Sequence, residues 1–261
     1  MESYSLDELC KKVCEIAIDA GKVIMEVYDT ADFSITTKTD NSPLTLADRK
    51  ANELICERLM ELTPDIPIIS EENKELPYSE RKGYHKSWMV DPLDGTKEFI
   101  KRNGEFTVNI AMIKEGRSIM GIVYAPALDE LYYGIKGKGS WKVSDDKTTM
   151  LKSNAFTMED PGLKVVCSRS HLNPETQAYI DDLLLPEKVS KGSSLKFLIL
   201  ANGGADLYPR LAPTMEWDTA AAQIILEEAG GKVLEATSGT PLAYNKPNLL
   251  NPHFYATGTV N

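Results

Sequence analysis

Short apolar runs that end abruptly in carboxylates constrain this chain more than any other feature. Ile68-Ile69-Ser70 leads into Glu71-Glu72, Met89-Val90 leads into Asp91, and Glu216-Trp217-Asp218 stands directly before a strongly apolar stretch. Folds that layer helices on sheets place their sites at strand ends. Carboxylates that gather there repel one another without a cation between them, and hard divalent cations prefer oxygen ligands. The pattern therefore predicts a mixed α/β fold with an acidic site at a sheet edge.

The middle acidic segment, Asp91-Pro92-Leu93-Asp94-Gly95-Thr96, predicts a defined local backbone conformation. Pro92 fixes its own φ and biases Asp91 toward extended geometry. The turn that follows can aim two carboxylates and the Leu93 carbonyl at one point, and a helix beginning near Thr96 would favour a phosphate. Taken alone, the segment fits an Asx-type turn that caps a helix equally well, so both interpretations stay open at this level.

Two long helices are predicted near the start of the chain. Ser5 and Glu8 form a capping box before apolar residues at helical spacing over 6–28. Thr45 and Asp48 form another before a helix over 45–62. The other predicted helices cover 174–185, 193–201 and 219–229, and the predicted strands cover 33–37, 67–70, 88–90, 107–113, 119–124, 131–135, 163–167, 206–208, 233–234 and 254–256.

The order of these elements predicts a fold of the α+β or α/β class in two layered halves. Polar residues over 145–162 mark the expected boundary. The first half is therefore placed at 1–157 and the second at 158–261.

The acidic composition limits the partners. The 261 residues carry 29 Lys and Arg against 39 Asp and Glu, a formal net charge of −10. This balance disfavours a nucleic-acid polymer or an anionic membrane as partner, whereas metal ions can escort a small anionic substrate into an acidic site. No apolar run approaches the ~20 residues of a membrane span, and the N-terminus carries no export signal. These features predict a cytoplasmic protein and leave open its oligomeric state and a peripheral association with the inner membrane.

The cysteines and the lone histidines lack the spacing of metal ligands. Cys10, Cys14, Cys56 and Cys167 contain no C-x-x-C pair, which predicts buried, reduced thiols. The side chains of His85 and His253 are predicted at the surface.

The three acidic segments, in this order and over most of the chain, resemble the signature of the inositol monophosphatase superfamily. The resemblance implies a layered αβαβα sandwich of the sugar-phosphatase type and a Mg²⁺-dependent, lithium-sensitive phosphomonoesterase. It further implies that the half 1–157 carries most of the metal ligands. The half 158–261 would carry the substrate-binding loops and the last ligand.

Within the superfamily, the residues around these segments resemble the 3′(2′),5′-bisphosphate nucleotidases. The distinctive stretches are 94–99 leading into 103–110, then 167–171 ahead of 192–197, and 205–210. This branch implies hydrolysis of the 3′-phosphate of adenosine 3′,5′-bisphosphate to AMP and phosphate, a reaction of sulfur metabolism. Hydrolysis of inositol phosphate or fructose 1,6-bisphosphate by the same metal core is the alternative.

By the same resemblance, carboxylates hold two Mg²⁺ ions that clamp an in-line displacement by water. The implied ligands are Glu71, Asp91 and the Leu93 carbonyl for the first ion, and Asp91, Asp94 and Asp218 for the second. Glu71, Thr96 and Asp48 would act on the attacking water, with Asp48 either orienting Thr96 or adding a weaker third metal site. The implied substrate-binding residues are Gly95, Thr96, Ser168, Arg169, Ser170, His171, Gly192, Ser193, Ser194, Lys196, Tyr208, Arg210 and Glu216.

Several of these residues also have a purely structural explanation. Asp48 can close the capping box with Thr45, and the two roles are compatible. Residues 168–171 can form an ordinary connection, although an arginine beside hydroxyls suits a phosphate. Residues 192–194 can form a helix N-terminus. Lys196 can be solvated, and Glu216 can cap the helix that Asp218 begins.

Two other protein classes fit the residues less well. A haloacid-dehalogenase-type enzyme uses D-x-D-G-T with its acids two apart, whereas Asp91 and Asp94 are three apart. A cation-binding domain without catalysis needs neither the hydroxyl of Thr96 nor a third acidic segment, and the chain has both.

Overall fold

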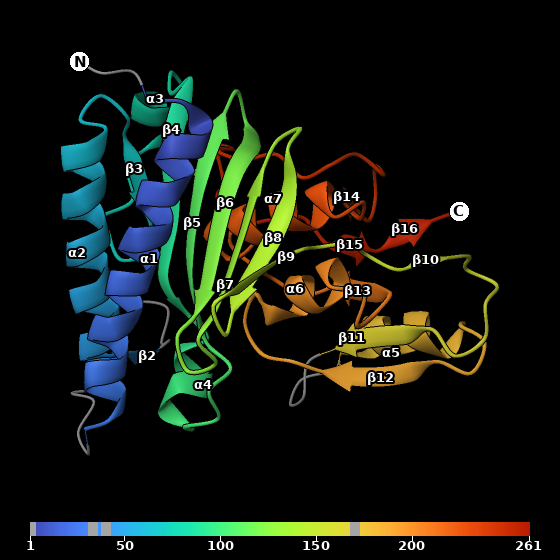
Figure 1. The fold of residues 1–261 in the computed structure, drawn as a ribbon. Helices are drawn as coiled ribbons and strands as arrows, with labels where there is room; N and C mark the ends of the chain where they lie inside the picture. The colour runs from blue at the N-terminus through green and yellow to red at the C-terminus, as the bar shows by residue number, and fades with distance from the viewer. Residues whose placement is uncertain (1–3, 31–35, 38–42, 168–172) are drawn as a thin grey trace.

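Five layers follow one another across the molecule (Figure 1). The computed structural model describes residues 4–30, 36–37, 43–167 and 173–261. Helices α1 (Leu6–Tyr28) and α2 (Leu46–Leu62) cover one face of a seven-stranded sheet, and α6 (Leu195–Ala201) and α7 (Ala220–Glu228) lie between that sheet and a five-stranded one. Helix α5 (Pro174–Asp181) covers the outer face of the second sheet. The expected αβαβα sandwich is confirmed.

The first sheet has the strand order β3-β4-β5-β6-β7-β8-β9, with β3 and β4 parallel and all other neighbours antiparallel. Its strands are β3 (Ile68–Ser70), β4 (Lys86–Asp94), β5 (Thr107–Lys114), β6 (Arg117–Ala125), β7 (Glu130–Ile135), β8 (Gly139–Ser144) and β9 (Lys147–Met150). Asp145 and Asp146 both adopt positive φ and form the turn between β8 and β9, as tight hairpins require. The interpretation of Asp145 and Asp146 as the start of a boundary region was therefore wrong.

The second sheet has the order β12-β11-β13-β15-β14. Its strands are β11 (Lys164–Cys167), β12 (Glu187–Ser190), β13 (Leu207–Arg210), β14 (Lys232–Glu235) and β15 (Phe254–Thr257). A short pair outside both sheets joins β10 (Ala155–Phe156) to β16 (Thr259–Val260), so the connection between the sheets is tied to the chain's last strand. The division into 1–157 and 158–261 stays a prediction.

The long helices match their predicted bounds, and both capping boxes form. Helix α5 ends earlier than predicted because Leu185 adopts a φ of +52° and Pro186 follows it; the chain then enters β12. Of the predicted strand 33–37, only β1 (Thr36–Thr37), paired with β2 (Pro43–Leu44), falls in the described residues. The remaining short helices are α3 (Tyr78–Arg81), α4 (Thr96–Ile100) and the 3₁₀ turn η1 (Glu216–Asp218).

The apolar core follows the alternation of the strands. Trp88 and Val90 of β4 pack toward α1 and α2, whereas Met89 packs toward α6 and α7. In the second sheet, Val166 joins the middle core and Val165 packs toward α5. Both sheets are therefore buried on the faces that meet α6 and α7, and the residues just before these helices lie between the sheets.

The predictions for the cysteines and histidines agree with the structure. All four cysteines are free; Cys14 is partly buried and the other three are buried. His85 and His253 are exposed. Among the described residues, no helix combines the length and the apolarity that crossing a bilayer requires.

Candidate metal and phosphate site

The parallel pairing of β3 and β4 brings the first two acidic segments together. Ser70 lies opposite Val90 in this pair, and the Glu71 amide donates to the Val90 carbonyl at 3.1 Å. Glu71 follows the end of β3 and therefore lies beside Asp91, which is still within β4, since β4 continues to Asp94. The first two acidic segments meet there as the sequence predicted.

The segment from Asp91 to Thr96 combines a local turn with the site. Pairing between β4 and β5 is irregular between Asp91 and Asp94, and the Asp91 Oδ1 atom accepts from the Leu93 amide at 3.1 Å. Gly95 has a φ of +94°, a conformation that favours glycine, and α4 begins at Thr96. The turn and the carboxylate cluster thus coexist.

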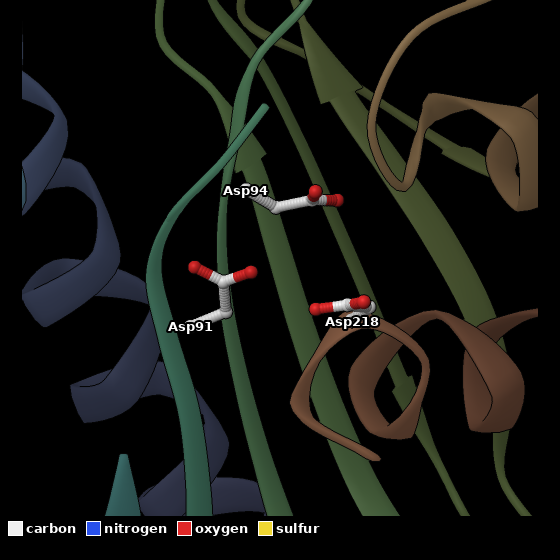
Figure 2. Close-up of side chains that lie close together, drawn as sticks. All are labelled: Asp91, Asp94 and Asp218. Atoms are coloured by element: carbon white, nitrogen blue, oxygen red, sulfur yellow. The ribbon is translucent and has the colours of Figure 1, made fainter. Parts of the chain in front are cut away.

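The third carboxylate comes from the far end of the sequence. Asp218 ends η1 directly before α7, and its Oδ2 atom accepts from the Met215 amide at 2.9 Å. One oxygen of each of Asp91, Asp94 and Asp218 lies within 4.8 Å of the others. Figure 2 shows Asp91 and Asp94 on β4 facing Asp218 across this gap.

The cluster strongly disfavours its own ionisation. Burial, and then the carboxylates of Glu71, Asp94 and Asp218, raise the pKa of Asp91 well above its usual range. Burial, and then Asp94, raise the pKa of Asp218 to about 8. Oxygen donors at this density, with this charge, fit a hard divalent cation such as Mg²⁺.

Thr96 and Asp48 are connected as predicted. Thr96 Oγ1 donates to Asp48 Oδ1 at 3.1 Å and lies 3.4 Å from the Leu93 carbonyl oxygen. The Asp48 Oδ2 atom accepts from the amide and the hydroxyl of Thr45, at 2.7 and 2.5 Å. Asp48 therefore closes the capping box and orients Thr96 at the same time. A third metal site at Asp48 stays a prediction.

Ser193 and Ser194 contact a carboxylate of the cluster. Their hydroxyls donate to Asp94 Oδ2 at 2.7 and 3.0 Å. Ser194 precedes α6, but its hydroxyl does not cap that helix. The amide of Gly192 donates to Glu105 Oε2 at 2.9 Å. Residues 192–194 therefore lie at a helix N-terminus, as the structural alternative has it, while the two serine hydroxyls contact Asp94.

Two cationic side chains lie beside the cluster, on the side of the second sheet. The Lys196 ammonium donates to the Ser193 carbonyl at 2.8 Å and lies 5.8 Å from the centre of the Tyr208 ring. Burial lowers the pKa of Lys196 to about 8, although Asp94 opposes that change. Arg210 donates to the Pro213 carbonyl at 2.8 Å, and its buried Nε has no hydrogen-bond partner among the described residues.

Glu216 does not join the site. Its fully buried carboxylate accepts from the amides of Asn245 and Lys246, at 2.5 and 3.1 Å, and from the Lys246 ammonium at 2.5 Å. The predicted contact with substrate, like the capping alternative, was therefore wrong, because three donors of the 245–246 turn occupy the carboxylate. The predicted residues Ser168, Arg169, Ser170 and His171 lie outside the described residues.

Sequence reasoning gave no functional role to Thr107 and Asn109 of β5. Both are fully or almost fully buried and contact the two serines. The available signal was their alternation with Val108 and Ile110. Two polar residues faced one side of a strand that is buried on both faces.

Comparison with known proteins agrees with this geometry. The model of the "Inositol monophosphatase family" matches residues 5–259. The "3′(2′),5′-bisphosphate nucleotidase CysQ" of Escherichia coli O6:H1 is 46% identical over 245 residues, covering 93% of this chain and 97% of that protein. The resemblance to bisphosphate nucleotidases is thereby confirmed.

Solved structures share the fold. The crystal structure of CysQ from Bacteroides thetaiotaomicron, "a bacterial member of the inositol monophosphatase family", has a TM-score of 0.85 at 42% identity, covering 97% of this chain and 98% of that chain. An inositol monophosphatase from Anabaena has a TM-score of 0.74 at 24% identity, covering 97% and 91%, and supports the fold alone. With the family model matched over nearly its whole length and the carboxylates of three separate segments gathered at one sheet edge, this chain belongs to the inositol monophosphatase family.

Proposed function

We propose that this protein is a cytoplasmic, Mg²⁺-dependent phosphomonoesterase that removes the 3′-phosphate of adenosine 3′,5′-bisphosphate, producing AMP and phosphate. The observation that carries the proposal is the gathering of Asp91, Asp94 and Asp218 within 4.8 Å, beside two cationic side chains. The names of the CysQ relatives support the choice of substrate.

The carboxylate cluster would hold the metal. Glu71, Asp91 and the Leu93 carbonyl would form one binding position, and Asp91, Asp94 and Asp218 the other. A divalent cation bound there supplies Lewis-acid stabilisation of charge on a phosphoryl group and lowers the pKa of water. Two Mg²⁺ ions, with Asp48 available to a weaker third, are part of the proposal.

Thr96 and Asp48 would guide the proton of the attacking water. The Thr96 hydroxyl donates to the buried Asp48 carboxylate, so its oxygen retains lone pairs that can accept from a water. Asp48 Oδ1 is the acceptor behind Thr96, and the Thr45 donors hold that carboxylate in place. This pair orients the nucleophile, and the remaining catalysis is positioning and charge neutralisation.

Lys196 and Arg210 would bind the substrate's phosphate that is not cleaved. Lys196 is close enough to the Asp94 and Asp218 carboxylates for them to affect its pKa, and Arg210 influences that of Asp218. Two partly buried cations next to an acidic metal site suit a substrate with two phosphates. A substrate with one phosphate, such as inositol 1-phosphate, would leave them uncompensated. Ser168 to His171, by the family resemblance, would complete this part of the site.

The test compares phosphate release in Mg²⁺ from adenosine 3′,5′-bisphosphate, inositol 1-phosphate and fructose 1,6-bisphosphate. We expect kcat/KM to favour the nucleotide by about a hundredfold, which corresponds to about 2.7 kcal/mol of transition-state discrimination. A preference for inositol 1-phosphate would retain the metal site and overturn the assignment of Lys196 and Arg210. A preference for fructose 1,6-bisphosphate would retain both and overturn the choice of the nucleotide. No phosphate release from any of the three would contradict the proposed reaction.

A further inference from the structure

We propose that Asn109 and Thr107 act as positioning residues for the metal site, by directing the hydroxyls of Ser194 and Ser193 onto Asp94. The inference rests on the cation binding in the proposed function. It does not depend on which phosphate ester is the substrate. It assigns the two serines to the metal site, whereas the family resemblance places them among substrate contacts.

The donors and acceptors in this network can direct protons toward Asp94. Asn109 Nδ2, which can only donate, lies 2.9 Å from Ser194 Oγ, and Ser194 Oγ lies 3.0 Å from both Asp94 Oδ2 and the Asp218 carbonyl oxygen. Ser194 Oγ therefore accepts from Asn109, and its own proton is available to either of these two acceptors. Each bond in this chain polarises the next.

Thr107 and Ser193 form a parallel chain. Their hydroxyl oxygens lie 2.5 Å apart, and Ser193 Oγ lies 2.7 Å from Asp94 Oδ2. With the Ser193 proton given to the carboxylate, Thr107 is the donor to Ser193, and Asn109 Oδ1, 3.1 Å from Thr107 Oγ1, is the other acceptor for the Thr107 proton. Both hydroxyls thus converge on Oδ2, which leaves Oδ1 of Asp94 to a cation.

The same network connects the first sheet to the segments that precede α6 and α7. Asn109 lies opposite Asp91, and Thr107 opposite Asp94, in the register of β5 with β4. Ser194 Oγ also lies 3.0 Å from the Asp218 carbonyl oxygen. A single buried hydroxyl therefore contacts two of the segments that carry carboxylates. An apolar pair at 107 and 109 would satisfy the core equally well, so these polar residues point to a role at Asp94.

The experiment measures Mg²⁺ binding to the metal-free protein by isothermal titration calorimetry, without substrate. Ser194→Ala and Asn109→Leu should each raise the Kd for Mg²⁺ by about tenfold or more, the range found when groups behind metal ligands are removed. Thr107→Val should raise it as well, whereas Thr107→Ser, which keeps the hydroxyl, should bind like the wild type. At saturating Mg²⁺, KM for adenosine 3′,5′-bisphosphate should change less than twofold in the variants of Asn109 and Thr107.

The outcomes separate the two proposals. Wild-type affinity for Mg²⁺ in Ser194→Ala and Thr107→Val would overturn the inference, and so would a raised substrate KM with an unchanged Kd for Mg²⁺. If a variant fails to fold, as judged by circular dichroism, the Thr107→Val and Thr107→Ser pair decides, because Thr107→Val removes the hydroxyl at nearly constant volume and Thr107→Ser keeps the hydroxyl and removes a methyl group. A wild-type protein that binds no Mg²⁺ would contradict the proposed metal dependence and this inference together. Binding of Mg²⁺ without nucleotide hydrolysis would contradict the proposed substrate alone.

Discussion

The Asp94 carboxylate contacts hydrogen-bond donors and also lies close to other carboxylates. Two serine hydroxyls donate to one of its oxygens, and the carboxylates of Asp91 and Asp218 lie on the other side. The three carboxylates repel one another at this separation, which conflicts with their gathering at one point. A cation among the three acids removes this conflict, which is the physical reason to expect metal dependence.

Replacing Asp94 with asparagine tests its role at the metal site. Asp94→Asn keeps the shape of the side chain and removes the charge that a cation requires, so turnover should fall below a tenth of the wild-type value. The fold should persist, because loss of one carboxylate relieves repulsion in the cluster. Phosphate release and thermal unfolding, measured on the same preparation, check both statements. Activity above a tenth of wild type, still dependent on Mg²⁺, would contradict the assignment.

The raised pKa of Asp218 predicts how the metal-free protein responds to pH. Its pKa is about 8 in the folded protein against an ordinary value of 3.8, so the folded state binds this proton more tightly than the unfolded state does. The resulting stabilisation is complete below pH 3.8 and is lost as the pH rises through 8. The Tm of the metal-free wild type should therefore fall, relative to that of Asp218→Asn, between pH 5 and 9.

Mg²⁺ should reverse this loss. Ionised carboxylates bind the cation, so the increase in Tm that Mg²⁺ produces should grow with pH over the same range. Differential scanning calorimetry with and without Mg²⁺ measures both trends. A constant difference in Tm between wild type and Asp218→Asn over this range would show that the cluster does not carry the assigned repulsion.

At the scale of elements, the close approach of α7 to the first sheet positions Asp218. A Cβ atom added at Gly121 of β6 would lie 2.2 Å from the Ala221 carbonyl oxygen, and one at Gly134 of β7 would lie 3.0 Å from Ile225 Cα. The two glycines on neighbouring strands therefore let the start of α7 lie directly on the sheet. Asp218 stands just before α7, so this contact between α7 and the sheet sets the distance from Asp218 to β4.

Gly121→Ala should displace α7 and cost stability. Overpacking of this kind lowers the free energy of unfolding by about 1–3 kcal/mol, and the shift should also weaken Mg²⁺ binding. Gly83→Ala is the matched control, because an added Cβ there meets no atom within 4 Å; its effect should stay within about 0.5 kcal/mol. Urea denaturation of both variants provides the comparison. Equal free energies of unfolding for the two variants would show that α7 can move away from Gly121 without loss of stability.

At the scale of the whole molecule, buried charges connect segments that are far apart in sequence. Arg81 is 1% exposed and donates to the Leu76 carbonyl, to Asn245 Oδ1 and to the carbonyls of Lys246 and Pro247. Glu216 holds the same 245–246 turn from the other side. The stretch after Glu71 and the segment before Asp218 are thus joined through one turn near the end of the chain.

Arg81→Lys should break this connection although it keeps the charge. An ammonium cannot reproduce the planar fork that reaches several carbonyls, and acceptors left without donors cost about 1–3 kcal/mol each. We expect the free energy of unfolding to fall by about 2–4 kcal/mol in chemical denaturation. Arg58→Lys, with a side chain that is 42% exposed, should change it by less than about 0.5 kcal/mol. Similar effects of the two substitutions would contradict the role given to Arg81.

The long helices, most of the strands and the identity of the clustered acids follow from local sequence alone. Capping residues and apolar periodicity favour a helix or strand through contacts within a few positions of the chain. The acidic residues at the ends of β3 and β4 come together whenever those two strands pair. The hairpin at Asp145-Asp146 was missed because polar turn residues between a partly buried strand and an exposed one look like a linker.

Only the tertiary structure decided what each polar residue contacts. Glu216 stands two positions before Asp218, yet its carboxylate is held by Asn245 and Lys246. Ser193 and Ser194 contact Asp94, about a hundred positions away, through hydroxyls that Thr107 and Asn109 orient. These partners depend on which strands pair and on how closely α7 lies on the sheet. Long-range packing sets those distances, and local order along the chain does not encode them.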